Sequence, residues 1–450
     1  MVKVMKKIFA FFMCGVFLIS EIPVATIYAT EVTQETSTPT QNTTTQGTAP
    51  QDTNTKNGAA AADNGTGTAA IGQSSESTTD NPDLNISSAS AVLIEGSTGS
   101  ILYEKNKDEQ RFPASITKIM TLVLIFEALD SGKITLTDKV TVSEHAASMG
   151  GSQVYLEPNE TQTVDDMIKC ITIASANDAC VAMSEYIAGS ETEFVNMMNQ
   201  KAAELGMKNT KFMNCCGLDD TIAEGSHYSS AYDIALMSRE LIMKYPEVSK
   251  YSTTWMDSII HVTKKGETEF GLTNTNKLVR TYTGITGLKT GSTSKAKYCL
   301  SASANRNGMD LIAVVMAAPE PKTRFAEAAS MLDYGFANCS MYAEDSTGMK
   351  IEPVKVKRGR SDSVTLKVSS AFHYLLLKGK TADKITKEAK VAENVQAPIG
   401  EGDQIGELIY SYDGNPIGSV PIIASESVSE AKFINYLEKV VKKFFICQEQ

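Results

Sequence analysis

The chain reads Pro113-Ala-Ser115-Ile-Thr-Lys118-Ile-Met-Thr121 where a nearly uncharged helix is predicted to begin. Apolar residues recur after Lys118 at helical spacing, and so few charges interrupt them that we expect this helix to be buried on almost every side. Side chains three positions apart share one helix face, so the Lys118 amine can reach the Ser115 hydroxyl. A serine with an amine beside it is the arrangement of an activated nucleophile.

Two further motifs follow in order, Ser175-Ala-Asn177 and Lys289-Thr-Gly291. Each motif alone is a weak signal, because Ser292-x-x-Lys295 repeats the first spacing and Ser303-Ala-Asn305 repeats the second. The ordered triple is far more specific, and it predicts acyl transfer through a serine without a histidine. None of the 4 histidines lies in a zinc-protease motif and no serine lies in a Gly-x-Ser-x-Gly motif, which disfavours zinc and Ser-His-Asp hydrolases.

The first two motifs carry the predicted catalytic residues Ser115, Lys118 and Ser175. Backbone N–H groups at a helix start are unsatisfied and partly positive, so the Ser115 N–H can donate to the oxyanion formed when its own Oγ attacks a carbonyl. Lys118 has to be neutral to act as a base, and burial beside a second cation, Lys289, favours the neutral amine. Ser175 can relay a proton to a leaving group, and Asn177 can orient a substrate amide.

The third motif is expected on an edge strand beside the site. Its glycines let a substrate backbone approach closely, and Thr290 can hydrogen-bond a terminal carboxylate. Backbone after Gly291, at Ser292, can supply a second oxyanion donor, and such a donor typically lowers a barrier by ~2.7–4 kcal/mol. The predicted substrate-binding residues are therefore Asn177, Lys289, Thr290, Gly291 and Ser292. We expect neither a metal ion nor a cofactor.

The first 83 residues are expected to lie outside the folded part. Residues 1–29 combine a basic start, an apolar run from Ile8 to Ile19 and small residues near Ala29, which predicts a secretory signal; an uncleaved anchor is the alternative. Residues 30–83 consist almost entirely of Thr, Gln, Asn, Ser, Gly and Ala, so they cannot offset their ordering entropy. They predict a disordered linker.

Charge and cysteine content restrict the partners. The net charge is −11 and the body has no basic cluster, which disfavours nucleic acid. Of the 8 cysteines, Cys14 lies in the predicted signal, and an odd number remains. We favour buried free thiols over disulfides, although an exported protein can pair some of them, and Cys215 and Cys216 are adjacent.

The remaining pattern predicts an α+β protein. Hairpins are expected around Gly96-Ser-Thr-Gly99 and at Asn305-Arg-Asn-Gly308. Helices are expected over Met167–Ile187, interrupted by the second motif, over Glu191–Leu205 and over Phe325–Phe336. Residues 84–341 should therefore pack helices on an antiparallel sheet and carry the catalytic site. Residues 342–424 alternate apolar and polar side chains, which predicts a small β-rich domain without a catalytic cluster.

Residues 425–450 are predicted to hold an amphipathic helix, from Val428 to Ile446. One face is apolar and aromatic, and the other carries lysines, a pattern that suits a membrane interface. The alternative is a helix packed on the second domain. The apolar face consists of Phe433, Ile434, Leu437, Val440, Val441 and Phe444.

The matches extend beyond the three short motifs. Longer stretches around them resemble the D-alanyl-D-alanine carboxypeptidases, the low-molecular-weight penicillin-binding proteins of serine peptidase family S11, from about Leu84 to Ser340. These stretches are Pro113–Thr121, Ala174–Ala179, Gly217-Leu-Asp219, His227–Asp233 and Gly287–Gly291.

The resemblance implies a penicillin-binding-protein/β-lactamase-like fold and a function. Ser115 would be the acyl-enzyme nucleophile, Lys118 the base, and Arg324 would match a family arginine near the substrate carboxylate. The substrates would be peptidoglycan stem peptides ending in D-Ala-D-Ala, and β-lactams would be covalent inhibitors. The protein would be exported and would act at the outer face of the bacterial cytoplasmic membrane or in the cell wall.

Some positions depart from the family pattern, and two rival functions stay open. Thr286 stands where Asp is common, Ser292 where Tyr or His is common, and Cys215-Cys216 where Pro-His is usual. One rival is a class A-like β-lactamase, for which Glu193-Phe-Val-Asn196 matches the letters of a deacylating motif inside a predicted amphipathic helix. The other is a non-catalytic peptidoglycan-binding protein, which the intact Ser115 and Lys118 disfavour.

Overall fold

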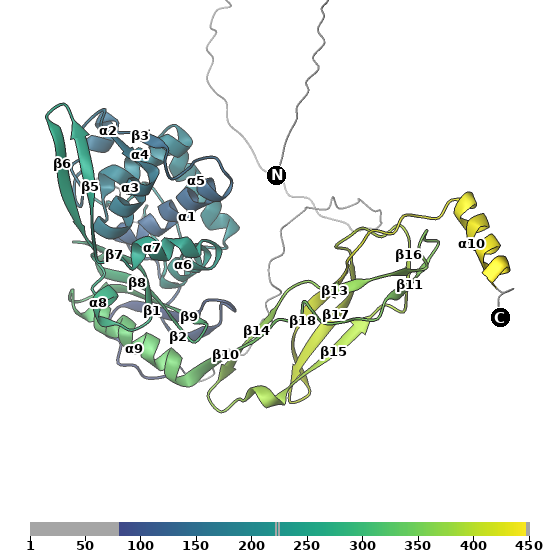
Figure 1. The fold of residues 1–450 in the computed structure, drawn as a ribbon. Helices are drawn as coiled ribbons and strands as arrows, with labels where there is room; N and C mark the ends of the chain where they lie inside the picture. Colours follow the sequence, from purple (N-terminus) through teal and green to yellow (C-terminus); the bar gives the residue numbers. More distant parts are fainter. Residues whose placement is uncertain (1–80, 221–222, 224–225, 447–450) are drawn as a thin grey trace, which may run out of the picture. The chain divides into compact units, whose positions relative to one another are not determined.

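Figure 1 shows the computed structural model, which describes residues 81–220, 223 and 226–446. The predicted signal segment and nearly all of the predicted linker lie outside the described residues. The described chain begins with extended segments that lead into a central sheet, and it ends in a helix, α10.

The central sheet has five strands in the order β2-β1-β9-β8-β7, and every neighbouring pair is antiparallel. Consecutive β1 residues pack alternately into two hydrophobic clusters, Ala91 and Leu93 into one and Val92 and Ile94 into the other. The sheet is therefore covered on both faces. Its strands are β1 (Ser90–Glu95), β2 (Ile101–Lys105), β7 (Ile285–Thr293), β8 (Lys297–Arg306) and β9 (Met309–Ala318).

One face of the sheet packs against α9 (Thr323–Asn338), and the other packs against a helical layer. Gly335 permits the close approach of α9, because a Cβ there would lie 2.5 Å from Leu311 Cδ1. The helical layer surrounds α1 (Lys118–Asp130), in which ten of 13 residues are buried, as the uncharged sequence predicts. Helices on an antiparallel sheet confirm the predicted fold class.

The other helices and short strands of this part complete the frame of the site. The helices are η1 (Ala114–Thr117), α2 (Glu144–Ala147), α3 (Val164–Lys169), η2 (Cys170–Ala174), α4 (Asn177–Ala188), α5 (Glu191–Glu204), α6 (Ala231–Lys244), η3 (Pro246–Val248), α7 (Ser249–Ser252) and α8 (Leu278–Thr281). The short strands pair as β3 (Lys139–Thr141) with β4 (Thr161–Thr163), and as β5 (Met256–Thr263) with β6 (Gly266–Thr273).

The chain after α9 is rich in strands, as predicted. Strand β10 (Cys339–Glu344) pairs with β14 (Phe372–Leu377), and two further sheets have the orders β12-β11-β16 and β13-β18-β17-β15. Phe372 and Tyr410 stack in its core with ring centroids 3.8 Å apart. The remaining elements are β11 (Val354–Lys357), β12 (Ser363–Val364), β13 (Leu366–Val368), η4 (Ala382–Lys384), β15 (Ile385–Val391), β16 (Asn394–Gln396), β17 (Gln404–Tyr412) and β18 (Asn415–Ala424).

The last helix, α10, spans Phe433–Ile446 and so begins five residues after the predicted start. Val428 is buried in the core of the β-rich part and exchanges two backbone hydrogen bonds with Ile399. The helix therefore starts only after the chain has left that core. Within the described part of the chain, no helix is long and apolar enough to cross a membrane.

Candidate active site

The predicted nucleophile lies in a tight turn before α1. Ser115 belongs to the 3-10 turn η1, and the α-helix begins only at Lys118. The turn packs closely against β7, because a Cβ at Gly291 would lie 2.8 Å from the Pro113 carbonyl oxygen. Ser115 is half-buried, and its Oγ accepts a hydrogen bond of 3.1 Å from Lys118 Nζ.

Lys118 is fully buried, and its Nζ lies within hydrogen-bond distance of three oxygen atoms. Its Nζ donates to Ser115 Oγ, to Asn177 Oδ1 at 2.6 Å and to the Cys216 carbonyl at 2.9 Å. None of these partners is a carboxylate. The amine is therefore oriented by neutral groups, and its proton is not held by an ion pair.

The second motif lies at a break between helices, as predicted. A π-turn, η2, precedes Ser175, and α4 begins at Asn177. Ser175 has a φ of 63°, in the left-handed region that non-glycine residues seldom adopt. Its buried Oγ accepts a hydrogen bond of 2.7 Å from Lys289 Nζ. Such backbone strain and π-turns are concentrated at functional sites.

Lys289 is a second buried amine in the same cluster. Burial is the main cause that holds its pKa well below the usual value, and the positive charges of Lys118 and Arg324 add to this effect. The two lysines are linked to the two serines, Lys118 to Ser115 and Lys289 to Ser175. These two hydrogen-bonded pairs, together called the polar cluster, bring four groups that can carry a proton into the site.

The third motif lies on β7, which is an edge strand of the sheet, as predicted. Thr290 Oγ1 donates to Thr275 Oγ1 at 2.7 Å, and the Ser292 side chain is exposed. Gly291 lies against the Ser115 turn. The open edge next to the nucleophile provides backbone groups to which an extended substrate can pair.

Two predicted substrate ligands have protein partners in this structure. Asn177 Nδ2 donates to the Gly150 carbonyl at 2.6 Å while its Oδ1 accepts from Lys118, so this amide orients the base. Arg324 Nη1 donates to the Gly291 carbonyl at 2.9 Å and to the Cys299 carbonyl at 3.3 Å. Burial lowers the pKa of Arg324. The guanidinium therefore links the backbones of β7 and β8 at Gly291 and Cys299.

The segment Asn214–Gly217 contributes groups that sequence reasoning did not assign. The Cys216 carbonyl is an acceptor for Lys118, and Gly217, with a φ of 86°, leaves no room for a Cβ beside the Ala114 carbonyl oxygen. A hydrogen bond from Cys215, followed by the charge of Lys118, lowers the pKa of the Cys216 thiol to about 7. The sequence does show the motif Gly217-Leu-Asp219 next to this segment. The role of the Cys216 carbonyl could not be predicted, because a backbone acceptor does not depend on the type of side chain.

The cysteines and histidines of the described chain do not form a competing site. The six described cysteines are free, and five of them are buried. His227 accepts from the Met213 N–H through Nδ1 and lies 3.0 Å from Thr117 Oγ1. Burial lowers its pKa to about 4. Among the described residues, no group of three or more His, Cys, Asp or Glu side chains is arranged to hold a metal ion.

Glu193, the residue on which the β-lactamase alternative depends, is an exposed residue in the first turn of α5. Its backbone N–H is capped by Ser190 Oγ, and its carboxylate accepts from Asn196 at 3.4 Å. These contacts are local to the helix surface. They do not connect Glu193 to either serine of the polar cluster.

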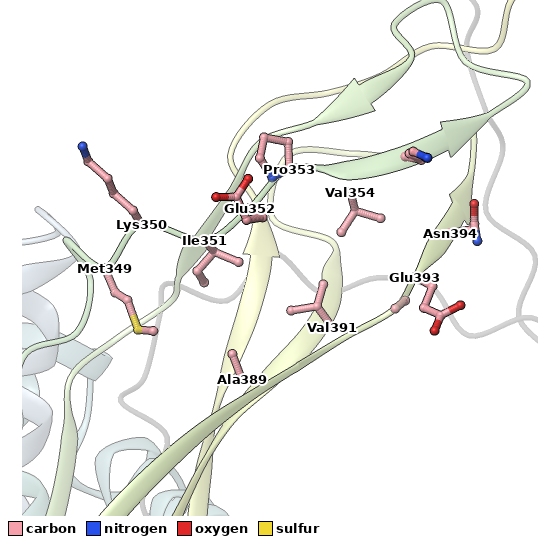
Figure 2. Close-up of a pocket in the computed structure, with 12 residues that line it drawn as sticks. Met349, Lys350, Ile351, Glu352, Pro353, Val354, Ala389, Val391, Glu393 and Asn394 are labelled. Carbon is pink, nitrogen blue, oxygen red and sulfur yellow. The ribbon is translucent and has the colours of Figure 1, made fainter.

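A cavity of about 620 Å³ lies in the β-rich part, between the segment leading into β11 and the β15–β16 connection (Figure 2). Its lining includes Ile351, Val354, Val391 and Glu393 but no serine, cysteine or histidine. It therefore lacks the nucleophile and base that the polar cluster provides.

Comparisons with known proteins identify the family of the chain. A family model described as D-alanyl-D-alanine carboxypeptidase, Peptidase_S11, matches residues 75–320, and the model of the penicillin-binding protein 5 C-terminal domain matches residues 336–430. The chain is 47% identical to D-alanyl-D-alanine carboxypeptidase DacF of Bacillus subtilis over 352 residues, covering 78% of this chain and 88% of DacF.

Solved structures give the same result. Penicillin-binding protein 5 from Haemophilus influenzae superposes with a TM-score of 0.65 at 34% identity, covering 78% of this chain and 100% of that one. Penicillin-binding protein D2 from Listeria monocytogenes, in its ampicillin-bound form, has a TM-score of 0.50 at 31% identity, covering 57% of this chain and 100% of that one. The chain belongs to the D-alanyl-D-alanine carboxypeptidase family, peptidase family S11.

Proposed function

We propose that this protein is a serine-type D-Ala-D-Ala carboxypeptidase, which removes the terminal D-alanine from peptidoglycan stem peptides through an acyl-enzyme on Ser115. The observation that carries the proposal is the Lys118 Nζ–Ser115 Oγ contact of 3.1 Å inside a buried cluster without a carboxylate. A neutral amine in that position is a base for the hydroxyl. The family membership supports the substrate class.

In the acylation step, Ser115 Oγ attacks the carbonyl carbon of the penultimate D-alanine and its proton passes to Lys118. The N–H groups of Ser115 and Ser292 stabilise the oxyanion. The C–N bond to the terminal D-alanine then breaks, and the leaving nitrogen takes a proton from the cluster through Ser175, which Lys289 holds at 2.7 Å. In the second step, water attacks the ester carbonyl and the bond from that carbon to Ser115 Oγ breaks. One water proton restores the Ser115 hydroxyl, and the shortened peptide leaves as a carboxylic acid.

Lys289, Thr290 and the edge of β7 are the proposed binding groups for the substrate. The Lys289 amine and the Thr290 hydroxyl can donate hydrogen bonds to the terminal carboxylate, while the backbone of β7 at Gly291 and Ser292 lies along the extended peptide. Asn177 and Arg324 act mainly through other groups, because their amide and guanidinium already bond Lys118 and the backbone of β7. A penicillin offers a carbonyl and a carboxylate to the same groups and would acylate Ser115.

The test is to incubate the protein with a fluorescent penicillin and with a diacyl D-Ala-D-Ala peptide, following covalent label and free D-alanine. Ser115→Ala should abolish both signals. Ser429→Ala is the matched control, because Ser429-x-x-Lys432 repeats the motif spacing and the serine is exposed. A Ser115→Ala protein that still becomes labelled would contradict the assignment of the nucleophile.

The same assay separates the carboxypeptidase from a β-lactamase. We expect a long-lived penicilloyl-enzyme, because the exposed Glu193 is bonded within α5 and cannot activate water at the ester. Rapid turnover of penicillin that is lost in Glu193→Ala would support the β-lactamase instead. A folded protein that neither labels nor releases D-alanine would support a non-catalytic peptidoglycan-binding role.

We also propose the cellular setting. Residues 1–29 would be a signal peptide and residues 30–83 a linker, with the catalytic domain at 84–341 and the β-rich domain at 342–424. The segment 425–450 would attach the protein to the outer face of the cytoplasmic membrane. The support is the exposure of its apolar side chains, 82% for Phe433 and 76% for Phe444.

A further inference from the structure

Tyr155 is an exposed aromatic residue in a strained backbone conformation near the second motif. Its side chain is 65% exposed, and its φ is 62°, in the left-handed region that favours glycine and asparagine. A turn alone would be served better by either of those residues. The strained backbone therefore indicates a function for the Tyr155 ring, because strained residues persist where the surrounding structure holds them for a functional purpose.

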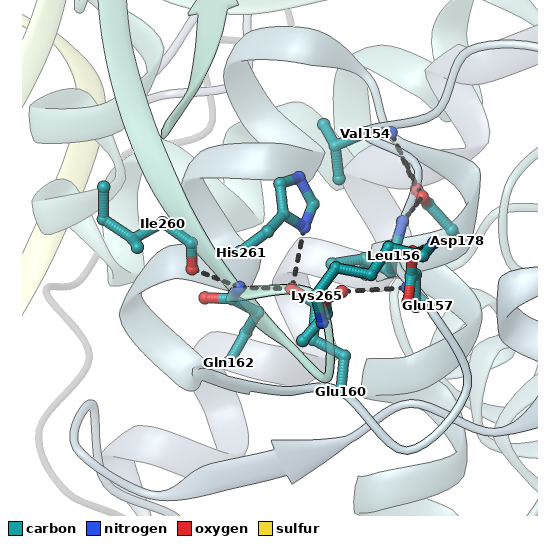
Figure 3. A network of polar contacts seen from close by, with 10 residues as sticks. Val154, Leu156, Glu157, Glu160, Gln162, Asp178, Ile260, His261 and Lys265 are labelled. Atoms are coloured by element: carbon teal, nitrogen blue, oxygen red, sulfur yellow. Dashed lines mark hydrogen bonds and ion pairs between the residues drawn. The ribbon is translucent and has the colours of Figure 1, made fainter. Parts of the chain in front are cut away.

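The backbone on both sides of Tyr155 is held by a single buried carboxylate. Asp178 Oδ2 accepts from the Val154 N–H and from the Leu156 N–H, each at 3.1 Å (Figure 3). Asp178 directly follows Asn177, whose own N–H donates to the Ser152 carbonyl at 2.7 Å. The Tyr155 segment is thus attached rigidly to the residue that orients Lys118.

The chain that follows Tyr155 is hydrogen-bonded to the β5–β6 hairpin at Glu160 and Gln162. The buried Glu160 carboxylate lies 2.7 Å from His261 Nδ1 on β5, and Gln162 Nε2 donates to the Ile260 carbonyl at 2.8 Å (Figure 3). On β6, Phe270 contacts the Tyr155 ring edge-on, with centroids 6.0 Å apart, and also the His261 ring at 5.6 Å. The β5–β6 hairpin and the segment around Tyr155 therefore each contribute one ring to an aromatic pair, Phe270 and Tyr155.

The two rings come from segments that touch the two sides of the site. Tyr155 leads back to Asn177 through Gly150 and Ser152, and β6 leads forward to Thr275, whose hydroxyl accepts from Thr290 of the third motif. Tyr155 follows Ser152 by three residues, so at most about 11 Å of backbone separates it from the Asn177 contact, within reach of a peptide that continues beyond the reacting carbonyl.

We propose that Tyr155 and Phe270 form an aromatic subsite that binds the stem-peptide residues upstream of D-Ala-D-Ala. This inference rests on the proposed function. An extended peptide advances about 3.3 Å per residue, so residues before the terminal pair lie outside the Ser115–Lys118–Ser175–Lys289 cluster and need their own contacts. Aromatic rings supply such contacts with a large apolar surface and little side-chain entropy to lose. The subsite selects longer stem peptides over short ones.

The experiment compares kcat/KM for N-acetyl-D-Ala-D-Ala, which has no upstream residue, a full pentapeptide and the same pentapeptide carrying its disaccharide. Tyr155→Asn removes the ring and suits the left-handed backbone, so the fold is retained. We expect KM for both pentapeptide substrates to rise about 5- to 10-fold, with N-acetyl-D-Ala-D-Ala hydrolysis and penicillin acylation unchanged. Met256→Ala is the matched control, because Met256 is also 65% exposed and lies on the strand face of β5 opposite His261.

The outcomes separate the subsite from the catalytic assignment. Phe270→Leu should give the same selective change, and Tyr155→Phe should restore pentapeptide binding, because the ring and not the hydroxyl makes the contact. The thermal midpoint of Tyr155→Asn should equal or exceed that of the native protein. A variant that loses N-acetyl-D-Ala-D-Ala hydrolysis and penicillin labelling together, or one with unchanged KM for every substrate, would overturn the subsite. A change confined to the disaccharide-bearing substrate would overturn the assignment to peptide. Failure of the proposed function itself would appear in the native protein as missing D-alanine release.

Discussion

At the scale of single residues, the base of this site is defined by what its amine touches. Lys118 donates to a hydroxyl, a side-chain amide and a backbone carbonyl, and two of these acceptors are themselves fixed by other hydrogen bonds or by the chain. The three contacts set the direction of the amine toward Ser115. No carboxylate is among the three, so the amine makes no ion pair at this position.

Replacing Lys289 by methionine tests the role of the second amine. The pKa of Lys289 is held below its usual value, so between that depressed value and about 10.4 the unfolded chain binds one more proton than the folded one, and stability rises with pH across this window. Lys289→Met should remove this pH dependence while lowering D-alanine release at least ~100-fold, the order seen when one charge-stabilising group is lost. Denaturant unfolding across pH and the D-alanine assay measure the two effects.

Lys208→Met, at an exposed position, is the control for a lost positive charge. It should leave activity and pH dependence as in the native protein. Full carboxypeptidase activity in Lys289→Met would remove Lys289 from the proposed mechanism.

His227 gives a second pH dependence of the same sign at lower pH. Its folded pKa of about 4 lies below the ordinary 6.5, so acidification charges the imidazole in the unfolded chain first and stability falls as pH drops from about 6.5 toward 4. Between pH 7 and pH 5 this amounts to roughly 2 kcal/mol. His227→Gln should lose that part of the pH dependence, as urea unfolding at the two pH values would show.

The control is His145→Gln, which removes an imidazole that is 55% exposed and lies 3.0 Å from the Glu191 carboxylate. Identical pH dependence in the native protein and in His227→Gln would show that the buried imidazole is not responsible.

At the scale of elements, the parts that the sequence predicted are those whose signal is local. The Asn-Gly step predicted the β8–β9 hairpin, and apolar residues at helical spacing with few charges predicted the buried helix α1. The π-turn before Ser175 was not predicted, because its left-handed serine is held by Lys289 from a strand more than a hundred residues away. The late start of α10 was missed for the same reason, since Val428 is held by Ile399.

Gly217→Ala tests whether the turn before α1 and the Gly217 loop are mutually fitted. A Cβ at Gly217 would collide with the Ala114 carbonyl and approach Thr117 Oγ1 to 2.8 Å, and the positive φ adds strain. We expect a loss of ~1–3 kcal/mol in stability and a slower acylation by penicillin, because the collision falls on the backbone next to Ser115. Thermal unfolding and stopped-flow labelling would measure both.

Gly132→Ala is the matched control, since Gly132 also has a positive φ, of 69°, but nothing lies within 4 Å of an added Cβ. It should lose a similar amount of backbone stability without slowing acylation. Equal labelling rates for the two variants would contradict the proposed fit between turn and loop.

At the scale of the whole molecule, the proposed site and the proposed attachment are separable. Deleting residues from Phe433 onward should release the protein from membranes and leave activity on soluble peptides unchanged, because Val428 and the rest of the β-rich core are retained. Lys439 already pairs with Asp362, while Lys442 and Lys443 in the sequence suit anionic headgroups. Each such lysine adds ~1 kcal/mol near an anionic surface, so high salt should weaken the native attachment.

Fractionation of membranes carrying either form measures the release. A truncated protein that stays bound would indicate attachment through the N-terminus, and one that unfolds would show that α10 is part of the fold. Phe433→Ser with Phe444→Ser in the full chain is the companion variant, because both side chains are exposed and their replacement should weaken attachment without unfolding.

The open edge of β7 has a consequence for storage and handling of the protein. A strand whose backbone is left unpaired for substrate is also a template on which another chain can add, and proteins usually cover or charge such edges. Here the strand cannot be covered without closing the site. The protein with penicillin bound in the site should therefore aggregate less on heating than the free protein. The inhibitor would thus protect from aggregation the enzyme that it inactivates.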